Sequence, residues 1–212
     1  MKNITVLLSG QGSNLQALIE ACSRKYVKAN ISAVLSNNPR AFGLLLAQEA
    51  KIPSHIIELQ RFSSSSFFDA AMAEEIAQYQ PDLVVLAGYM RILSQKFVAQ
   101  FSGKIINIHP SLLPKYPGLH THRKALESGD KEHGTSIHFV TDELDGGPLI
   151  LQSKVPVFIE DTEEMLTSRV KTQEHIIYPL VVKWFIEERL KMYKGEALLD
   201  GLRIPNAGLI AK

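Results

Sequence analysis

The chain has 212 residues, of which 45% are hydrophobic, and its 23 Lys and Arg residues nearly balance 22 Asp and Glu residues. This length predicts a single domain over residues 1–212 whose core folds without disulfides, and the lone cysteine, Cys22, fits a reducing compartment such as the cytoplasm. The balanced charge argues against a nucleic-acid partner, and no apolar run is long enough to span a membrane, so we expect a cytoplasmic protein that binds neither.

The first half of the chain alternates between strand-like and helical patterns. The first strand is expected at Ile4–Leu8, and the first helix at Ser13–Lys25, where Cys22 lies on the apolar face and is interpreted as a core residue. Further strands are expected at Ile31–Ser36, Asp82–Gly88, Lys104–His109 and Thr135–Thr141. Helical patterns separate the earlier ones at Phe42–Lys51, Phe67–Tyr79 and Ser94–Phe101. Strands that are apolar on both faces predict an α/β fold with a doubly wound, mostly parallel sheet.

The pattern changes in the C-terminal half of the chain. Two apolar segments flank the polar turn Asp142–Gly147, which predicts a hairpin that adds antiparallel strands to the sheet. A long helix is expected at Thr162–Leu190, with a kink at Pro179, followed by a short tail. Earlier in the chain, Ser63–Ser66 is expected to form a mobile loop that ends in a helix cap at Ser66.

A glycine-containing loop, "SGQGSN" (Ser9–Asn14), joins the first strand to the first helix. In an open α/β sheet this is a place for a phosphate, because main-chain N–H groups and the helix dipole both face it. The dinucleotide fingerprint fails, since it needs a glycine at Leu15, and a P-loop ending is missing too. The alternative is a tight glycine turn with no ligand.

Asn107 and His109 lie two residues apart at the expected end of a buried strand. Their side chains therefore point to the same side, where an amide N–H can stabilise an oxyanion and an imidazole can carry a proton. Asp142, Glu143 and Asp145 in the polar turn offer a carboxylate to orient the imidazole. The structural alternative is an Asn in a turn, a core His and ordinary turn residues.

Metal binding is a further alternative for the histidines. The candidate ligands are His109, His120, His122 and His138. No HExxH pattern and no cysteine cluster accompanies them, so we expect no metal.

Several longer segments carry a family resemblance. "NIHPSLLPKYPG", "HTHRKAL" and "HGTSIHFVTDELDGGPLILQ" resemble the folate-dependent formyltransferases, as do "GQGSN", "VVLAGYMRIL" and "RVKTQEHIIYP". The resemblance covers Ile4 to about Pro205 and is greatest to the single-domain branch that acts in purine synthesis. It implies a Rossmann-like formyltransferase fold. It also implies 10-formyltetrahydrofolate as co-substrate, the amine of glycinamide ribonucleotide as acceptor, and direct transfer without a metal.

The resemblance also implies roles for individual residues. It assigns residues 1–102 to a nucleotide- and phosphate-binding lobe and residues 103–212 to a folate-binding and catalytic lobe. The implied catalytic residues are Asn107, His109 and Asp145. The implied ribonucleotide-binding residues are Gly12, Ser13, Asn14, Lys171, Thr172, Gln173 and Glu174. The implied folate-binding residues are Met90, Arg91, Ile92, Leu93, Asn107, Thr141, Asp142, Glu143, Leu144 and Asp145.

Two positions depart from the family pattern. Gln11 replaces an asparagine in the glycine loop, and Ser65 stands where an arginine often contacts the folate, with Arg61 as a possible substitute. Other functions stay open: a related formyltransferase or a formyl-folate hydrolase with another acceptor, or a non-catalytic nucleotide-binding domain. The sequence leaves a monomer and a homodimer equally open.

Overall fold

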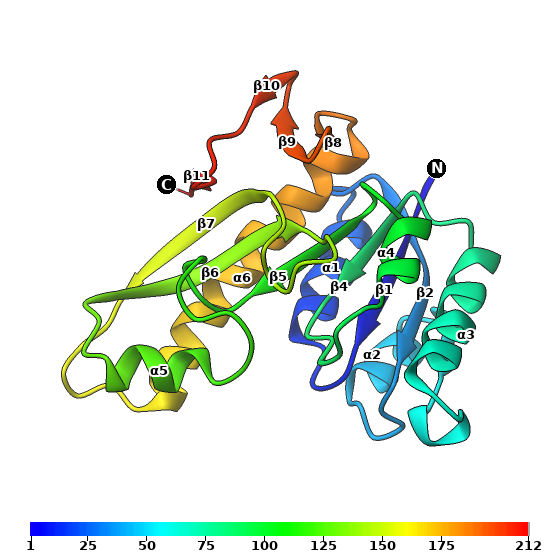
Figure 1. Ribbon diagram of the computed structural model, residues 1–212, viewed down its shortest axis with the longest axis horizontal. Helices are drawn as coiled ribbons and strands as arrows, with labels where there is room; N and C mark the ends of the chain where they lie inside the picture. The colour runs from blue at the N-terminus through cyan, green and yellow to red at the C-terminus, as the bar shows by residue number, and fades with distance from the viewer. Residues whose placement is uncertain (212) are drawn as a thin grey trace.

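The computed structural model describes residues 1–211, which form a large twisted sheet with helices on both faces and a small separate sheet near the C-terminus (Figure 1). Within that range the strands are β1 (Lys2–Leu8), β2 (Ala29–Ser36), β3 (Ser54–Ile56), β4 (Leu83–Leu86), β5 (Ile105–His109), β6 (Glu132–Phe139), β7 (Leu149–Pro156), β8 (Leu190–Tyr193), β9 (Glu196–Leu199), β10 (Leu202–Arg203) and β11 (Leu209–Ile210). The helices are α1 (Ser13–Ser23), α2 (Gly43–Glu49), α3 (Ser65–Gln78), α4 (Gln95–Gln100), α5 (Thr121–Glu127) and α6 (Glu163–Ile186), with a short 3-10 turn at Leu59–Arg61.

The large sheet confirms the predicted fold class. Its strand order over residues 1–211 is β11-β7-β6-β5-β4-β1-β2-β3. Strands β5, β4, β1, β2 and β3 are mutually parallel, and the chain order reverses between β1 and β4. That reversal is the topological switch point, where open α/β sheets bind ligands beyond the carboxyl ends of the strands.

The C-terminal hairpin is also confirmed. Strand β6 pairs antiparallel with both β5 and β7, and β11 then adds to the edge of β7 in the parallel direction. Strands β8, β9 and β10 form the separate antiparallel sheet. The sequence patterns did not predict this small sheet, nor β3, β11 and α5.

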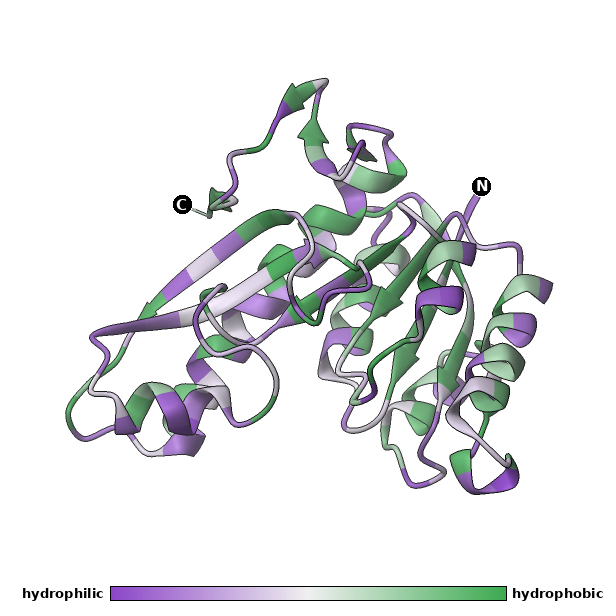
Figure 2. Ribbon diagram, viewed as in Figure 1, coloured by the Kyte–Doolittle hydropathy of each residue, from purple (hydrophilic) through white to green (hydrophobic). Residues whose placement is uncertain are grey.

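Apolar side chains fill both sides of the large sheet. The ribbon of its central strand β4 is coloured as hydrophobic in Figure 2. On one face the core includes residues of α1, α2 and α6, and on the other it includes residues of α3 and α4. Cys22 packs partly buried against the first of these clusters, as expected, and burial raises the pKa of its thiol to about 11. The thiol is therefore protonated near neutral pH, which disfavours a nucleophilic role.

Two predicted helix boundaries were wrong. The cap of α3 is Ser64, whose hydroxyl accepts from the Phe67 N–H, and not Ser66. Helix α6 begins as expected after Thr162, continues through Pro179 and ends at Ile186, because Leu190 already begins β8. None of the helices within residues 1–211 combines the length and the apolar composition that crossing a bilayer requires.

Candidate active site

The candidate site lies where β1, β4 and β5 end. Leu86 of β4 pairs with Leu7 of β1 and with Asn107 of β5, so the three strands finish at nearly the same level. Helix α6 is tied to this edge by Tyr178, whose buried hydroxyl lies 2.8 Å from the Leu86 carbonyl oxygen and 3.2 Å from that of Ile106. The loops that follow the strands therefore meet at one place.

The three predicted catalytic residues come together there. His109 Nδ1 lies 3.5 Å from Asp145 Oδ2, and both side chains are almost fully buried, at 7% and 9% exposure. Asp145 lies in a turn at a left-handed φ of 50°, and the same carboxylate oxygen accepts a hydrogen bond of 2.9 Å from the Gly118 N–H. A separation of 3.5 Å is longer than a strong hydrogen bond and leaves the pair free to tighten around a substrate.

Asn107 is oriented by His138, for which the sequence suggested only a role as a metal ligand. His138 on β6 lies directly opposite Asn107, and its Nε2 is 3.1 Å from Asn107 Nδ2. Its Nδ1 lies 2.9 Å from the Phe139 carbonyl oxygen, which can only accept, so Nδ1 carries the proton and Nε2 accepts from the amide. Burial lowers the pKa of His138, which keeps the ring neutral. The second N–H of Asn107 is then left for a ligand.

The glycine loop has the geometry of an anion site. Gly12 precedes α1 at a φ of 76°, and a Cβ there would lie 2.6 Å from the Cα of Gly43. Only glycine fits this close approach, and it brings the α1 N-terminus to the same edge as Asn107 and His109. The N–H groups of a first helical turn have no intrahelical partner, so they are available to an anion.

The buried side chain of Asn14 connects the glycine loop to α6. Its Nδ2 donates to Glu174 Oε2 over 2.8 Å, and Thr135 Oγ1 lies 3.4 Å from the other Glu174 oxygen. Among the described residues, Asn14 Oδ1 is buried without a hydrogen-bond partner. This oxygen can accept a hydrogen bond from a hydroxyl or an amine, and the main-chain N–H groups of the first helical turn are available to an anion.

The other α6 residues of the predicted ribonucleotide site separate onto two faces. Gln173 accepts from the Ser153 hydroxyl over 2.9 Å and so belongs to the contact between α6 and β7. Lys171 and Thr172 line a surface depression of about 650 Å³. The other residues around this depression are Glu163, Glu164, Thr167, Ser168 and His175. Of the four α6 residues, Glu174 is the one that forms a hydrogen bond with the glycine loop, through Asn14.

The two predicted folate segments lie side by side. Met90–Leu93 follows β4, and it is anchored by the Met90 N–H, which donates to Ser9 Oγ over 2.9 Å. Gln95, just beyond it, reaches Asp142 Oδ2 over 3.3 Å and so connects it to Thr141–Asp145. The exposed apolar side chains along these segments are Met90, Ile92 and Leu144. Exposed apolar groups beside free main-chain groups suit a flat, apolar-faced ligand.

The two arginines near Ser65, Arg91 and Arg61, already interact with other side chains. The Arg91 guanidinium stacks over the Phe68 ring at 4.7 Å and reaches Ser65 Oγ at 3.5 Å. Arg61, the suggested substitute for a folate-binding arginine, forms an ion pair of 2.6 Å with Glu58. The structure gives Arg61 a role in its own loop.

Two further histidines, the buried His133 and the half-buried His122, form a separate pair. His122 Nδ1 lies 3.1 Å from His133 Nε2. Burial lowers the pKa of both rings, to about 4 for His133, and a charge on His122 lowers the pKa of His133 further. Within residues 1–211 no group of three His, Cys, Asp or Glu side chains has the arrangement of a metal site.

This pair predicts a loss of stability in mild acid. An unfolded histidine takes up a proton below its ordinary pKa of about 6.5, whereas folded His133 stays neutral until about pH 4. Protons therefore favour the unfolded chain, so the free energy of unfolding should fall as the pH falls from about 6.5 to 4. Urea unfolding of His133→Gln should show a weaker pH dependence over this range. His120→Gln, which changes an exposed histidine, should retain the wild-type dependence, and identical slopes in all three proteins would contradict the prediction.

Comparison with known proteins decides the family. Residues 2–182 match the family described as formyl transferase. The chain belongs to this family. It is 59% identical over 209 residues to phosphoribosylglycinamide formyltransferase of Escherichia coli (strain K12), covering 99% of both chains. It is also 50% identical to the protein of the same name from Haemophilus influenzae, covering 98% of both.

A larger relative and a solved structure support the same family assignment. The human trifunctional purine biosynthetic protein adenosine-3 is 43% identical over 180 residues, which are 85% of this chain and 18% of that protein. The structure of the phosphoribosylglycinamide formyltransferase of Coxiella burnetii superposes with a TM-score of 0.95 at 48% identity, covering 100% of this chain and 99% of that one. The fold is therefore that of the formyl transferases.

Proposed function

We propose that this chain transfers the formyl group of 10-formyltetrahydrofolate to the amine of glycinamide ribonucleotide, a step of purine synthesis. The observation that carries the proposal is the convergence of Asn107, His109 and Asp145 at the switch point of a formyl transferase fold. The identity of 59% over 99% of the Escherichia coli phosphoribosylglycinamide formyltransferase supports this acceptor. As parts of the same proposal, the enzyme works in the cytoplasm as a monomer or a homodimer.

The site geometry suits direct transfer. The acceptor amine attacks the formyl carbon, and the carbonyl oxygen becomes an oxyanion in the tetrahedral intermediate. Asn107, oriented by His138, has an N–H available to donate to that oxygen. The attacking amine loses a proton and the departing folate nitrogen gains one, and His109 beside Asp145 transfers it. The bond from carbon to the folate nitrogen then breaks.

The two substrates approach from different sides of this trio. The ribonucleotide phosphate binds the N–H groups of Gly12, Ser13 and Asn14, and the Asn14 side-chain oxygen accepts from a hydroxyl or the amine. Lys171 and Thr172 extend this side of the site. The folate binds between Met90–Leu93 and Thr141–Asp145, whose main chain meets the edge of the pterin.

The function is tested by the absorbance change as formyl-folate becomes tetrahydrofolate, with the amine acceptor omitted and then supplied. We expect turnover only with glycinamide ribonucleotide, at one formylated product for each tetrahydrofolate. Equal turnover without an acceptor would identify a formyl-folate hydrolase instead. Binding of the ribonucleotide with no chemistry in either mixture would leave only a nucleotide-binding domain.

Gly12→Ala should weaken ribonucleotide binding. The new Cβ would collide with the Gly43 main chain at a φ that disfavours side chains, so the loop must shift. Loss of one charge-assisted hydrogen bond corresponds to about a tenfold rise in the Kd of the ribonucleotide. Calorimetric titration measures it. Gly10→Ala is the matched control, since a Cβ there meets nothing within 4 Å. A folded Gly12→Ala protein that binds like Gly10→Ala would refute the loop assignment.

Ser65→Arg should tighten the binding of polyglutamylated folate. Position 65 begins α3 beside the folate segment, and a free cation there would face the carboxylates of the tail. An exposed charge pair contributes little, so we expect about a two- to fivefold lower Kd at low salt, where screening is least. Ser66→Arg, at the next exposed position, controls for net charge. Equal affinities in wild type and Ser65→Arg would mean that this position does not contact the tail.

A further inference from the structure

One short loop contacts two members of the catalytic trio through its main chain. The Tyr116 carbonyl oxygen accepts from His109 Nε2 over 2.8 Å, and the Gly118 N–H donates to Asp145 Oδ2 over 2.9 Å. A carbonyl oxygen can only accept, so His109 Nε2 must carry a proton. The loop thereby leaves Nδ1, which faces Asp145, as the nitrogen that gains and loses a proton.

The backbone of this loop is in an unfavourable conformation. Tyr116 has a φ of 55°, in the left-handed region that a bulky side chain seldom adopts. Such a conformation persists only where the surrounding structure enforces it. Tyr116 must therefore be fixed by contacts outside its own peptide unit, or its carbonyl will not stay directed at His109.

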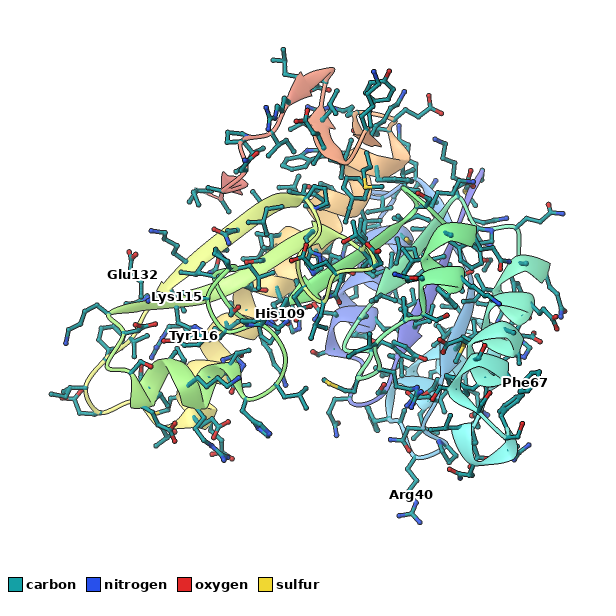
Figure 3. All side chains as sticks on the ribbon, in the orientation of Figure 1. Arg40, Phe67, His109, Lys115, Tyr116 and Glu132 are labelled. Atoms are coloured by element: carbon teal, nitrogen blue, oxygen red, sulfur yellow. The ribbon has the colours of Figure 1, made fainter. Side chains whose placement is uncertain are left out.

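Asp130 supplies those contacts from the connection between α5 and β6. Its Oδ2 accepts from the Tyr116 hydroxyl over 2.9 Å, and the Lys115 ammonium lies 3.0 and 3.1 Å from its two oxygens. Burial raises the pKa of Asp130, but the bonds from Lys115 and Tyr116 outweigh this and lower it overall, so the group is a carboxylate at neutral pH. Figure 3 shows Lys115 and Tyr116 near α5, with His109 toward the centre of the molecule.

We propose that Asp130 is a positioning residue for the catalytic trio. Through Lys115 and the Tyr116 hydroxyl it fixes the loop whose main chain sets the protonated nitrogen of His109 and orients Asp145. Asp130 acts through other residues and does not bind either substrate. Its importance for catalysis rests on the proposed formyl transfer, whereas its effect on His109 is a property of the free protein.

Kinetics test the catalytic half of the proposal. Asp130→Asn weakens both contacts, and Tyr116→Phe removes one hydroxyl while the ring stays. Each should lower kcat at least about tenfold, with the KM of both substrates within about twofold, because the trio is misaligned while the binding segments are intact. Asp130→Glu should recover part of the rate. Glu132→Gln is the matched control, since this carboxylate pairs with Lys154 on the surface two residues away and the rate should not change.

Nitrogen NMR of the His109 ring tests the structural half without substrate. At about pH 9, where a histidine is neutral, the wild-type ring should be almost entirely the Nε2–H tautomer, assigned by difference from His109→Gln. Tyr116→Phe and Asp130→Asn should show a mixture of tautomers, and Glu132→Gln the wild-type spectrum. Tyr116→Phe also tests the proposal should Asp130→Asn fail to fold.

The outcomes separate the two claims. A wild-type tautomer and a wild-type kcat in folded Tyr116→Phe would overturn the positioning role. A drop in kcat without a tautomer change would also overturn it, because the effect would then not pass through His109. A tautomer change in a protein that transfers no formyl group would support the positioning role and refute the proposed function.

Discussion

Replacing His109 with glutamine should lower kcat for formyl transfer by about 10²- to 10⁴-fold, the usual contribution of a positioned acid–base group. Glutamine retains an N–H for the Tyr116 carbonyl, but it cannot carry a proton between the acceptor amine and the folate nitrogen. The loss should appear in kcat, because His109 is almost fully buried and is not one of the residues proposed to bind either substrate. Stopped-flow measurement of a single turnover separates the chemical step from binding and product release.

The control for this variant is His55→Gln. His55 lies on β3, where it contacts Tyr79 and Glu75, and its loss should leave kcat near the wild-type value. A single-turnover rate of His109→Gln within about threefold of the wild-type rate would contradict the role of His109 as the proton carrier.

Replacing Asn107 with alanine should cost about 10²- to 10³-fold in kcat, as expected for an oxyanion donor. The alanine also leaves His138 Nε2 without its donor, but His138 still donates from Nδ1 to the Phe139 carbonyl. The fold should therefore persist, and thermal unfolding checks it. Asn107→Asp keeps the size but places a carboxylate against the oxyanion, so it should be at least as damaging. More than about half of the wild-type activity in a folded Asn107→Ala enzyme would show that the oxyanion is stabilised elsewhere.

Sequence periodicity predicted the parallel part of the fold because buried parallel strands are apolar on both faces. The runs at β1, β2, β4 and β5 each matched within a few residues. The small elements β3, β8, β9, β10, β11 and α5 were not predicted, because their stability comes from tertiary contacts. Strand β11, for example, is two residues that exist as a strand only through pairing with Leu151 and Gln152 of β7.

The site was predictable only where its residues lie close together in the sequence or match the family. Asn107 and His109 share a strand, so their convergence follows from the two-residue period of a strand. The partners that orient these two side chains lie outside this strand. His138 meets Asn107 only because β6 pairs antiparallel with β5 in one register, and Tyr116 meets His109 through a main-chain carbonyl that no side-chain pattern reveals.

The proposed acceptor is tested by comparing two acceptors for the same formyl group. Purified enzyme is mixed with 10-formyltetrahydrofolate and either glycinamide ribonucleotide or charged initiator tRNA at matched salt, and tetrahydrofolate formation is followed by absorbance. The chain has almost no excess of Lys and Arg with which to neutralise the many phosphates of a tRNA. The N-terminus of α1, in contrast, suits a single phosphate such as that of the ribonucleotide. We predict turnover with the ribonucleotide and none detectable with the tRNA. Turnover with the tRNA and none with the ribonucleotide would contradict the proposed function.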